Sequence, residues 1–115
     1  MRSTIRSICG LAGAEAKTTN GYPGWKANLH SPILQLTAAL YRELFASEPK
    51  IHAVHAGLEC GVLSARVAGG LDAVSFGPNI KGNHAPGERV EIRSVHKSYR
   101  LLTATLAHSA RGDLA

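Results

Sequence analysis

Strand-forming segments are scarce in this chain, and that scarcity most limits what it can fold into. Two short segments, Ile51–Ala56 and Ala73–Phe76, have the β-branched or aromatic residues and the following glycine of buried strands. Helical patterns alternate with them, which favours an α/β fold with a parallel sheet covered by helices. A parallel sheet of two strands would leave both edges open, because parallel strands normally lie within larger sheets. The pattern therefore predicts a piece of a larger fold.

Helices are expected before, between and after these strands. Ser31-Pro32 has the form of an N-cap followed by proline at the first helical position, and Glu48-Pro49 ends the helix that it opens. Ser94 is expected to cap a last helix that carries apolar residues as far as Leu106. Two further helices are expected at residues 5–12 and about 58–67, and a short strand at Glu15–Thr19.

Length and composition exclude several classes of protein. A chain of 115 residues fits one domain at most, and a hydrophobic content of 44% argues against wholesale disorder. The mean hydropathy is −0.04, and no apolar run approaches the roughly 20 residues that span a bilayer. The N-terminal apolar block is too short for a convincing secretory signal, and Cys9 and Cys60 are expected to be reduced thiols. A cytoplasmic protein is therefore expected.

The net charge of +5 raises the question of an anionic partner. Most basic residues are scattered singly, and only Arg93, Lys97 and Arg100 fall at helical spacing. No aromatic residues are interleaved for base stacking. The charge is therefore interpreted as a solvated basic surface, and neither nucleic acid nor membrane is expected as a partner. A small basic nucleic-acid-binding protein remains the weakest alternative.

Two clusters of candidate residues lie within and just after the first predicted strand. His52 and His55 are three residues apart and so point to opposite faces of a strand, where they cannot chelate one ion. His55 lies at the carboxyl end of the strand, where α/β proteins place ligands. Glu59 either complements a helix dipole or faces a ligand, and Cys60 reads as an inert buried thiol.

A third candidate lies on the long loop from Gly77 to Gly87. Asn83-His84 follows Gly82 where a phosphate-binding loop would need Lys-Ser or Lys-Thr, so that reading is excluded. His84 then stands on a Gly/Pro-rich loop after a buried strand. It is either an ordinary polar surface residue or a nitrogen ligand for zinc.

Four motifs together resemble the C-terminal end of the bacterial aminoacyl-histidine dipeptidases of the M20 metallopeptidase family. These enzymes are also called Xaa-His or cytosol non-specific dipeptidases. The motifs occur in the family's order, and the resemblance covers nearly the whole chain. They are GYPGW at Gly21–Trp25, HAGLECG at His55–Gly61, VSFGP at Val74–Pro78 and GNHAPGE at Gly82–Glu88. The seven-residue HAGLECG is the most specific of them.

The resemblance implies a fold and a division into two parts. Residues 1–27 would be the last helix and strand of a lid domain. Residues 28–115 would be the C-terminal segment of a zinc-peptidase-like, three-layer α/β/α catalytic domain. The missing strands of the sheet would then belong to a preceding part of the enzyme, together with the other metal ligands, the catalytic aspartate and the general-base glutamate. No catalytic residue is therefore expected in this chain.

The resemblance also implies roles for three residues. His84 would be a metal ligand, and Glu59 and Gly61 would lie at the site of the substrate's amino end. Two Zn²⁺ ions are implied in the complete enzyme, with Co²⁺ or Mn²⁺ as possible substitutes. The family loop has serine and aspartate where this chain has Ala85 and Gly87, whereas Glu88 is retained.

The implied function is that of a C-terminal fragment of a metal-dependent dipeptidase. The complete enzyme would hydrolyse Xaa-His and other dipeptides with a metal-activated water, and the fragment alone would be inactive. Its expected partners are the dipeptide substrate in the complete enzyme and either a second copy, through the lid, or a missing N-terminal half. The alternative is a non-catalytic remnant or interaction module, since an incomplete sheet leaves edges open to partners.

Overall fold

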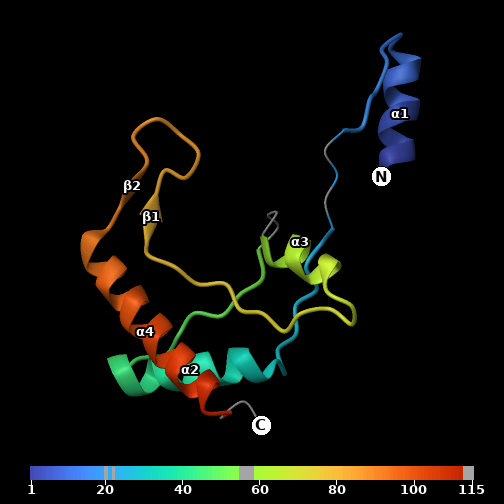
Figure 1. Cartoon of the computed structure of the whole chain (residues 1–115). Helices are drawn as coiled ribbons and strands as arrows, with labels where there is room; N and C mark the ends of the chain where they lie inside the picture. The colour runs from blue at the N-terminus through green and yellow to red at the C-terminus, as the bar shows by residue number, and fades with distance from the viewer. Residues whose placement is uncertain (20, 22, 55–58, 113–115) are drawn as a thin grey trace.

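The computed structural model describes residues 1–19, 21, 23–54 and 59–112. Within them the chain forms four helices and one small sheet, connected by long irregular segments (Figure 1). The helices are α1 (Arg2–Leu11), α2 (Pro32–Phe45), α3 (Glu59–Arg66) and α4 (Ile92–Ala110). The strands are β1 (Ile80–Lys81) and β2 (Arg89–Val90).

Helix α2 begins as the sequence predicts. The hydroxyl of Ser31 accepts a hydrogen bond from the backbone N–H of Leu34 at 3.2 Å, and Pro32 occupies the first turn. This bond satisfies one of the N–H groups that a helix start leaves without an intrahelical partner. The helix ends at Phe45, where Ala46 adopts a left-handed conformation with φ 48°, slightly before the predicted Glu48-Pro49.

Helix α4 begins two residues before its predicted cap. Glu91 is the N-cap, so Ser94 lies inside the first turn and the prediction of its role was wrong. The Ser94 hydroxyl donates to the Glu91 carbonyl at 2.6 Å and accepts from the backbone N–H of Asn79 at 2.8 Å. Ser94 therefore ties the segment that enters β1 to the start of α4.

The buried core lies between α2 and α4, which pack against each other. Its apolar members are Ala38, Leu40 and Leu101. Thr37 and Thr105 are buried beside them, and each hydroxyl donates to the backbone carbonyl four residues earlier in its helix. The buried hydroxyls are thus satisfied locally, and the core remains small.

The sheet is an antiparallel hairpin, with Ile80 opposite Val90 and Lys81 opposite Arg89. It differs from the parallel pair that the sequence predicts. The described parts of the three predicted strands, residues 15–19, 51–54 and 73–76, form no strand. A strand exists only where a neighbour pairs with its backbone, and none of the described segments pairs with these. Residues 55 and 56 of the first predicted strand lie outside the described residues.

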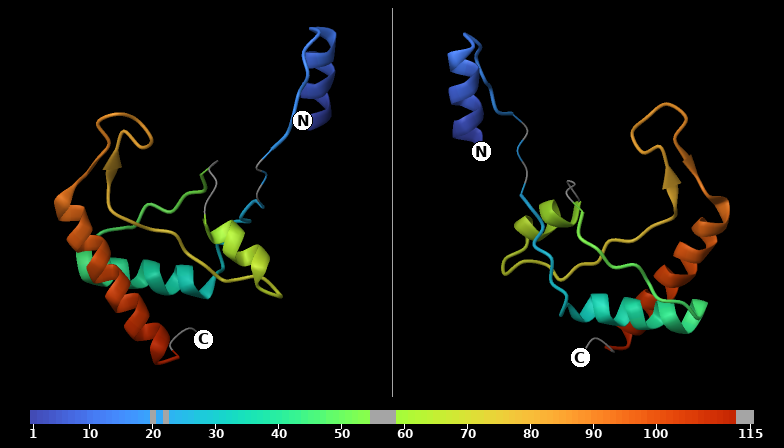
Figure 2. Two further views of the ribbon diagram at one scale, coloured as in Figure 1. Left: turned by 45° about the horizontal axis from the view of Figure 1, so that its top comes forward. Right: turned by 180° about the vertical axis from the view of Figure 1, so that it is seen from behind.

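The chain is extended for its length. Its radius of gyration is 18.9 Å, whereas a compact domain of this size has about 13 Å. Its accessible surface is 9346 Å², against about 6,000 Å² for a folded monomer of the same mass. Helix α1 stands apart from the other elements at the end of a long connection (Figure 2). The arrangement is a mixture of helices and a small sheet, compatible with a piece of an α/β fold.

None of the helices in the described ranges is both long and apolar enough to cross a bilayer.

Candidate functional site

The predicted metal ligand, His84, lies on the exposed loop that joins β1 to β2. Two turns shape this loop: Ala85 N–H donates to the Gly82 carbonyl, and Glu88 N–H donates to the Ala85 carbonyl, both at 3.1 Å. Gly82, His84 and Gly87 all have positive φ, with values of 69°, 62° and 84°. His84 is thus held in a left-handed conformation that non-glycine residues seldom adopt.

Glu88 stabilises this conformation. Its carboxylate accepts a hydrogen bond from the backbone N–H of His84 at 2.7 Å. A charge-assisted bond of this kind is stronger than a neutral one, so it offsets the strain of a left-handed histidine, which is of the order of 1 kcal/mol. Glu88 therefore orients the loop through the backbone and leaves the imidazole of His84 with no hydrogen-bond partner among the described residues.

The donors present do not make a metal site by themselves. In the described part of the chain, no three His, Cys, Asp or Glu side chains come together as a cation would require. Zinc takes four ligands in a structural site and three protein ligands in a catalytic one. His84 offers a single nitrogen on an exposed loop, so it could serve only as one member of a ligand set completed from elsewhere.

Glu59 is the first residue of α3, and its side chain is exposed. An acidic residue in the first turn interacts favourably with the helix dipole. The same exposure leaves the carboxylate accessible to a ligand. Both interpretations of Glu59 that the sequence allows are therefore compatible with its position.

Gly61 is buried where α3 meets the segment that precedes α2. A Cβ atom at Gly61 would lie 2.8 Å from the Pro23 carbonyl oxygen and 3.3 Å from the Trp25 backbone nitrogen. Only glycine permits this approach. A small cavity of about 240 Å³ opens beside the contact. Its lining residues are Pro23, Gly24, Trp25, Lys26, Gly61, Ser64, Ala65 and Leu71.

The GYPGW and HAGLECG motifs are in contact in the structure, whereas the GNHAPGE motif lies apart from them. Gly61 and Trp25 belong to different motifs and are 36 positions apart in the chain, yet they are in contact. The loop of His84 and the start of α3 lie on separate arms of the molecule (Figures 1 and 2). His55, the other candidate histidine, lies outside the described residues. Cys60 is a half-buried free thiol.

Sequence reasoning missed a polar link between α2 and α4. The ammonium of Lys97 donates to the Tyr41 hydroxyl at 2.6 Å and lies 4.4 and 4.5 Å from the ring centroids of Tyr41 and Phe45. The hydrogen bond from Lys97 is the main reason that the pKa of Tyr41 is lowered. The signal was the helical spacing that includes Lys97, but the spacing could not identify the aromatic partner.

Sequence comparison finds a dipeptidase that is similar to most of this chain. Over 104 residues the chain is 41% identical to the cytosol non-specific dipeptidase of Escherichia coli. The predicted resemblance is confirmed. The aligned residues make up 90% of this chain but 21% of that relative, so the chain spans about a fifth of the relative's length. No family model matches the chain.

Proposed function

We propose that this chain acts as the C-terminal part of a cytoplasmic, metal-dependent dipeptidase of the M20 family. The observation that carries the proposal is the 41% identity to a cytosol non-specific dipeptidase over nine-tenths of the chain. In this assignment residues 1–27 end the lid domain, and residues 28–115 form the last segment of a three-layer α/β/α catalytic domain. The complete enzyme hydrolyses Xaa-His and other dipeptides.

His84 is proposed as one ligand of the Zn²⁺ site, with Co²⁺ or Mn²⁺ as alternatives. Its exposure and its unengaged imidazole support this role, because a ligand nitrogen must be free to bind. Bound zinc supplies an activated water and a Lewis acid. Glu59 is proposed to face the free amino group of the dipeptide, and the backbone at Gly61 is proposed to line the same pocket.

The proposed partner is the polypeptide that carries the rest of the catalytic domain. Support comes from the large apolar side chains that the described residues expose. Ile51 and Val54 are 48% and 50% exposed on one predicted strand, and Phe76 is 39% exposed on the other. Such residues are normally buried on both faces of a parallel sheet. A sheet donated by the partner would bury them and would pair with the backbone of residues 51–54 and 73–76, which forms no ladder in the described structure.

The same exposed surface is the one observation that favours the alternative, a non-catalytic interaction module. Both a part of a dipeptidase and an interaction module would bind a partner polypeptide. They differ in whether the resulting complex hydrolyses dipeptides. A module would bind its partner and leave hydrolysis unchanged, whereas a part of an enzyme would complete the activity.

The test is complementation. The chain is mixed with a polypeptide that corresponds to the preceding four-fifths of the related dipeptidase, and zinc-dependent hydrolysis of alanyl-histidine is measured. We expect no activity from either piece alone and activity from the mixture. His84→Ala should lower the restored activity at least about 100-fold, and Glu88→Ala by about 10-fold through loss of loop orientation.

The matched control is His96→Ala, because His96 is an exposed histidine of α4 outside the proposed site. It should restore activity as well as the unmodified chain. Metal-dependent hydrolysis by the chain alone would contradict the proposed incompleteness. Full activity with His84→Ala would contradict the ligand assignment. Binding of the two pieces without any hydrolysis would favour the interaction module.

A further inference from the structure

A second pocket lies between α1 and the segment that follows it, and Gly21 is the one lining residue that it shares with the motifs above. Its volume is about 440 Å³, within the range of small-ligand sites. The residues that line it are Arg2, Ser3, Arg6, Thr18, Thr19 and Gly21. We propose that this pocket binds a small oxyanion, a carboxylate or a phosphate, between Arg2, Arg6 and Thr18.

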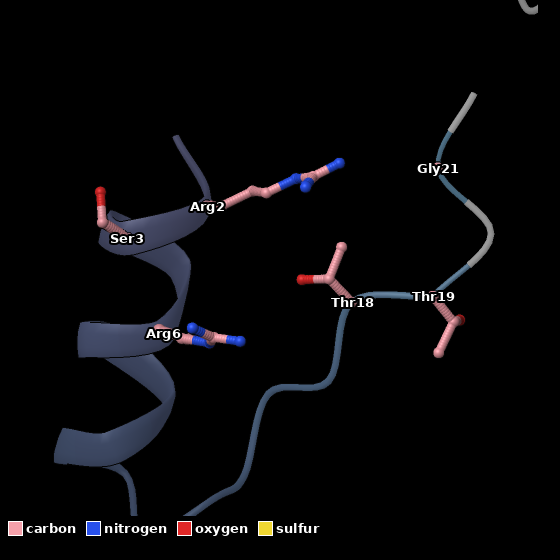
Figure 3. A pocket seen from close by; sticks show the side chains of 6 residues that line it. All are labelled: Arg2, Ser3, Arg6, Thr18, Thr19 and Gly21. Carbon is pink, nitrogen blue, oxygen red and sulfur yellow. The ribbon is translucent and has the colours of Figure 1, made fainter. Parts of the chain in front are cut away.

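The two arginines converge on this space. Arg2 and Arg6 are four residues apart in α1 and therefore lie on the same face of the helix. Figure 3 shows both side chains reaching from the helix toward the chain at Thr18 and Gly21, while Ser3 points away. A planar guanidinium presents paired N–H donors that match the geometry of carboxylate and phosphate oxygens.

The positive charge of the pair is uncompensated. The carboxylates that form ion pairs in the described ranges are Glu15, with Lys17, and Glu48, with Arg42. Neither guanidinium of α1 has such a partner there. Like charges one turn apart repel each other, and positive charge near a helix N-terminus opposes the dipole. Helix α1 has no acidic residue in its first turn that would relieve this. A bound oxyanion would relieve both effects.

The opposite wall suits an anion as well. The side chain of Thr18 points toward the arginines in Figure 3 and offers a neutral hydroxyl donor. Gly21 completes the wall without a side chain. A Cβ atom there would lie 3.3 Å from Nη2 of Arg2, so glycine keeps the space beside that guanidinium open. The wall therefore presents donors and free volume without a competing negative charge.

The experiment is a titration of the full chain followed by amide NMR of Thr18, Thr19 and Gly21 at low ionic strength. One arm uses inorganic phosphate, and a second uses alanyl-alanine beside its C-terminal amide, which lacks the carboxylate. We expect saturable shifts with a Kd of the order of 1 mM in at least one arm. The arm that saturates identifies the oxyanion as phosphate or carboxylate.

Three variants distinguish binding in the pocket from nonspecific attraction to positive charge. The double variant Arg2→Gln/Arg6→Gln should weaken binding at least about tenfold. Arg66→Gln/Arg93→Gln removes the same charge elsewhere and should change binding less than about twofold. Thr18→Val should weaken binding about threefold, and because it lies outside α1, its effect does not depend on helix stability.

Three results would overturn the proposal. The first is the absence of saturable shifts in both arms. The second is equal weakening by the two double variants, since binding would then follow net charge alone. The third is equal binding of alanyl-alanine and its amide when phosphate does not bind, because recognition would not involve the carboxylate.

Discussion

The absence of a Cβ atom at Gly61 determines how closely α3 approaches the segment at Pro23–Trp25. The hydrogen of Gly61, where other residues carry Cβ, lets the helix backbone of α3 approach the Pro23 carbonyl and the Trp25 backbone. The motifs that contain Trp25 and Gly61 could be recognised in the sequence. Their contact could not, because contacts between distant segments are set by tertiary structure. His84 was likewise recognised as a candidate ligand from its residue type and the composition of its loop. The left-handed backbone of His84 and its bond to Glu88 became visible only in three dimensions.

Replacing Gly61 by alanine should therefore separate α3 from the segment at Pro23–Trp25. A Cβ 2.8 Å from a backbone oxygen cannot be accommodated by a rotamer change, so we expect the contact to weaken by about 1–3 kcal/mol. Trp25 is the chain's only tryptophan, and its half-buried ring reports on the contact. Its fluorescence emission should shift to longer wavelength, and the urea midpoint of that signal should fall.

Gly10→Ala provides the matched control for this prediction. Gly10 lies within α1, and a Cβ there would meet nothing within 4 Å. The substitution should stabilise α1 by about 0.5–1 kcal/mol and leave the Trp25 emission unchanged. An unchanged emission in Gly61→Ala would show that the close approach of α3 is not maintained in solution.

At the scale of elements, the helices were largely predictable and the strands were not. Ser31-Pro32 starts α2 through a side-chain cap and a proline in the first turn. Both effects depend on neighbouring residues alone, so they can be predicted from the sequence. A strand depends on a partner that pairs with it, so Ala73–Phe76 has strand composition and yet no ladder in the described structure. The hairpin β1–β2 was missed for another reason. Its two-residue strands are too short to show a period.

The pairing of α2 with α4 should depend on pH through Tyr41. The hydrogen bond from Lys97 lowers the pKa of Tyr41 below its ordinary value of about 10. A group whose pKa is lowered by folding adds stability above its unfolded pKa and loses that contribution as the pH falls through its folded pKa. The pairing should therefore strengthen as the pH rises through the interval just below 10.

Phenolate absorbance measures this effect directly. The difference between the titrations of the unmodified chain and of Tyr41→Phe isolates Tyr41 from the other two tyrosines. Its midpoint should lie below 10, and Lys97→Gln should raise it, because the cationic donor that favours the phenolate is replaced by a neutral amide. A midpoint that does not move in Lys97→Gln would show that Lys97 does not contact the Tyr41 hydroxyl in solution.

At the scale of the whole molecule, the small core and the extended shape have one cause. Burial of apolar area drives folding, and the described residues bury few apolar side chains outside the contact of α2 with α4. Little apolar burial is therefore available to bring the remaining segments together. Leu29, Leu63 and Leu106 are each more than half exposed. The strand count predicts a piece of a larger fold, and the small core is compatible with that prediction. The sequence could not predict the relative positions of the arms, since no local pattern encodes them.

Small-angle scattering should accordingly give the monomeric chain a radius of gyration near 19 Å, well above the 13 Å of a compact domain. Exposed apolar surface should also bind the dye ANS. Adding the preceding four-fifths of the related dipeptidase should abolish most of the dye fluorescence, because the donated sheet would cover the exposed side chains. Bovine serum albumin, titrated with its own dye signal subtracted, is the control for nonspecific association. A monomer near 13 Å that binds no dye would mean that the chain closes a core of its own, and the partner would then have no apolar surface to cover.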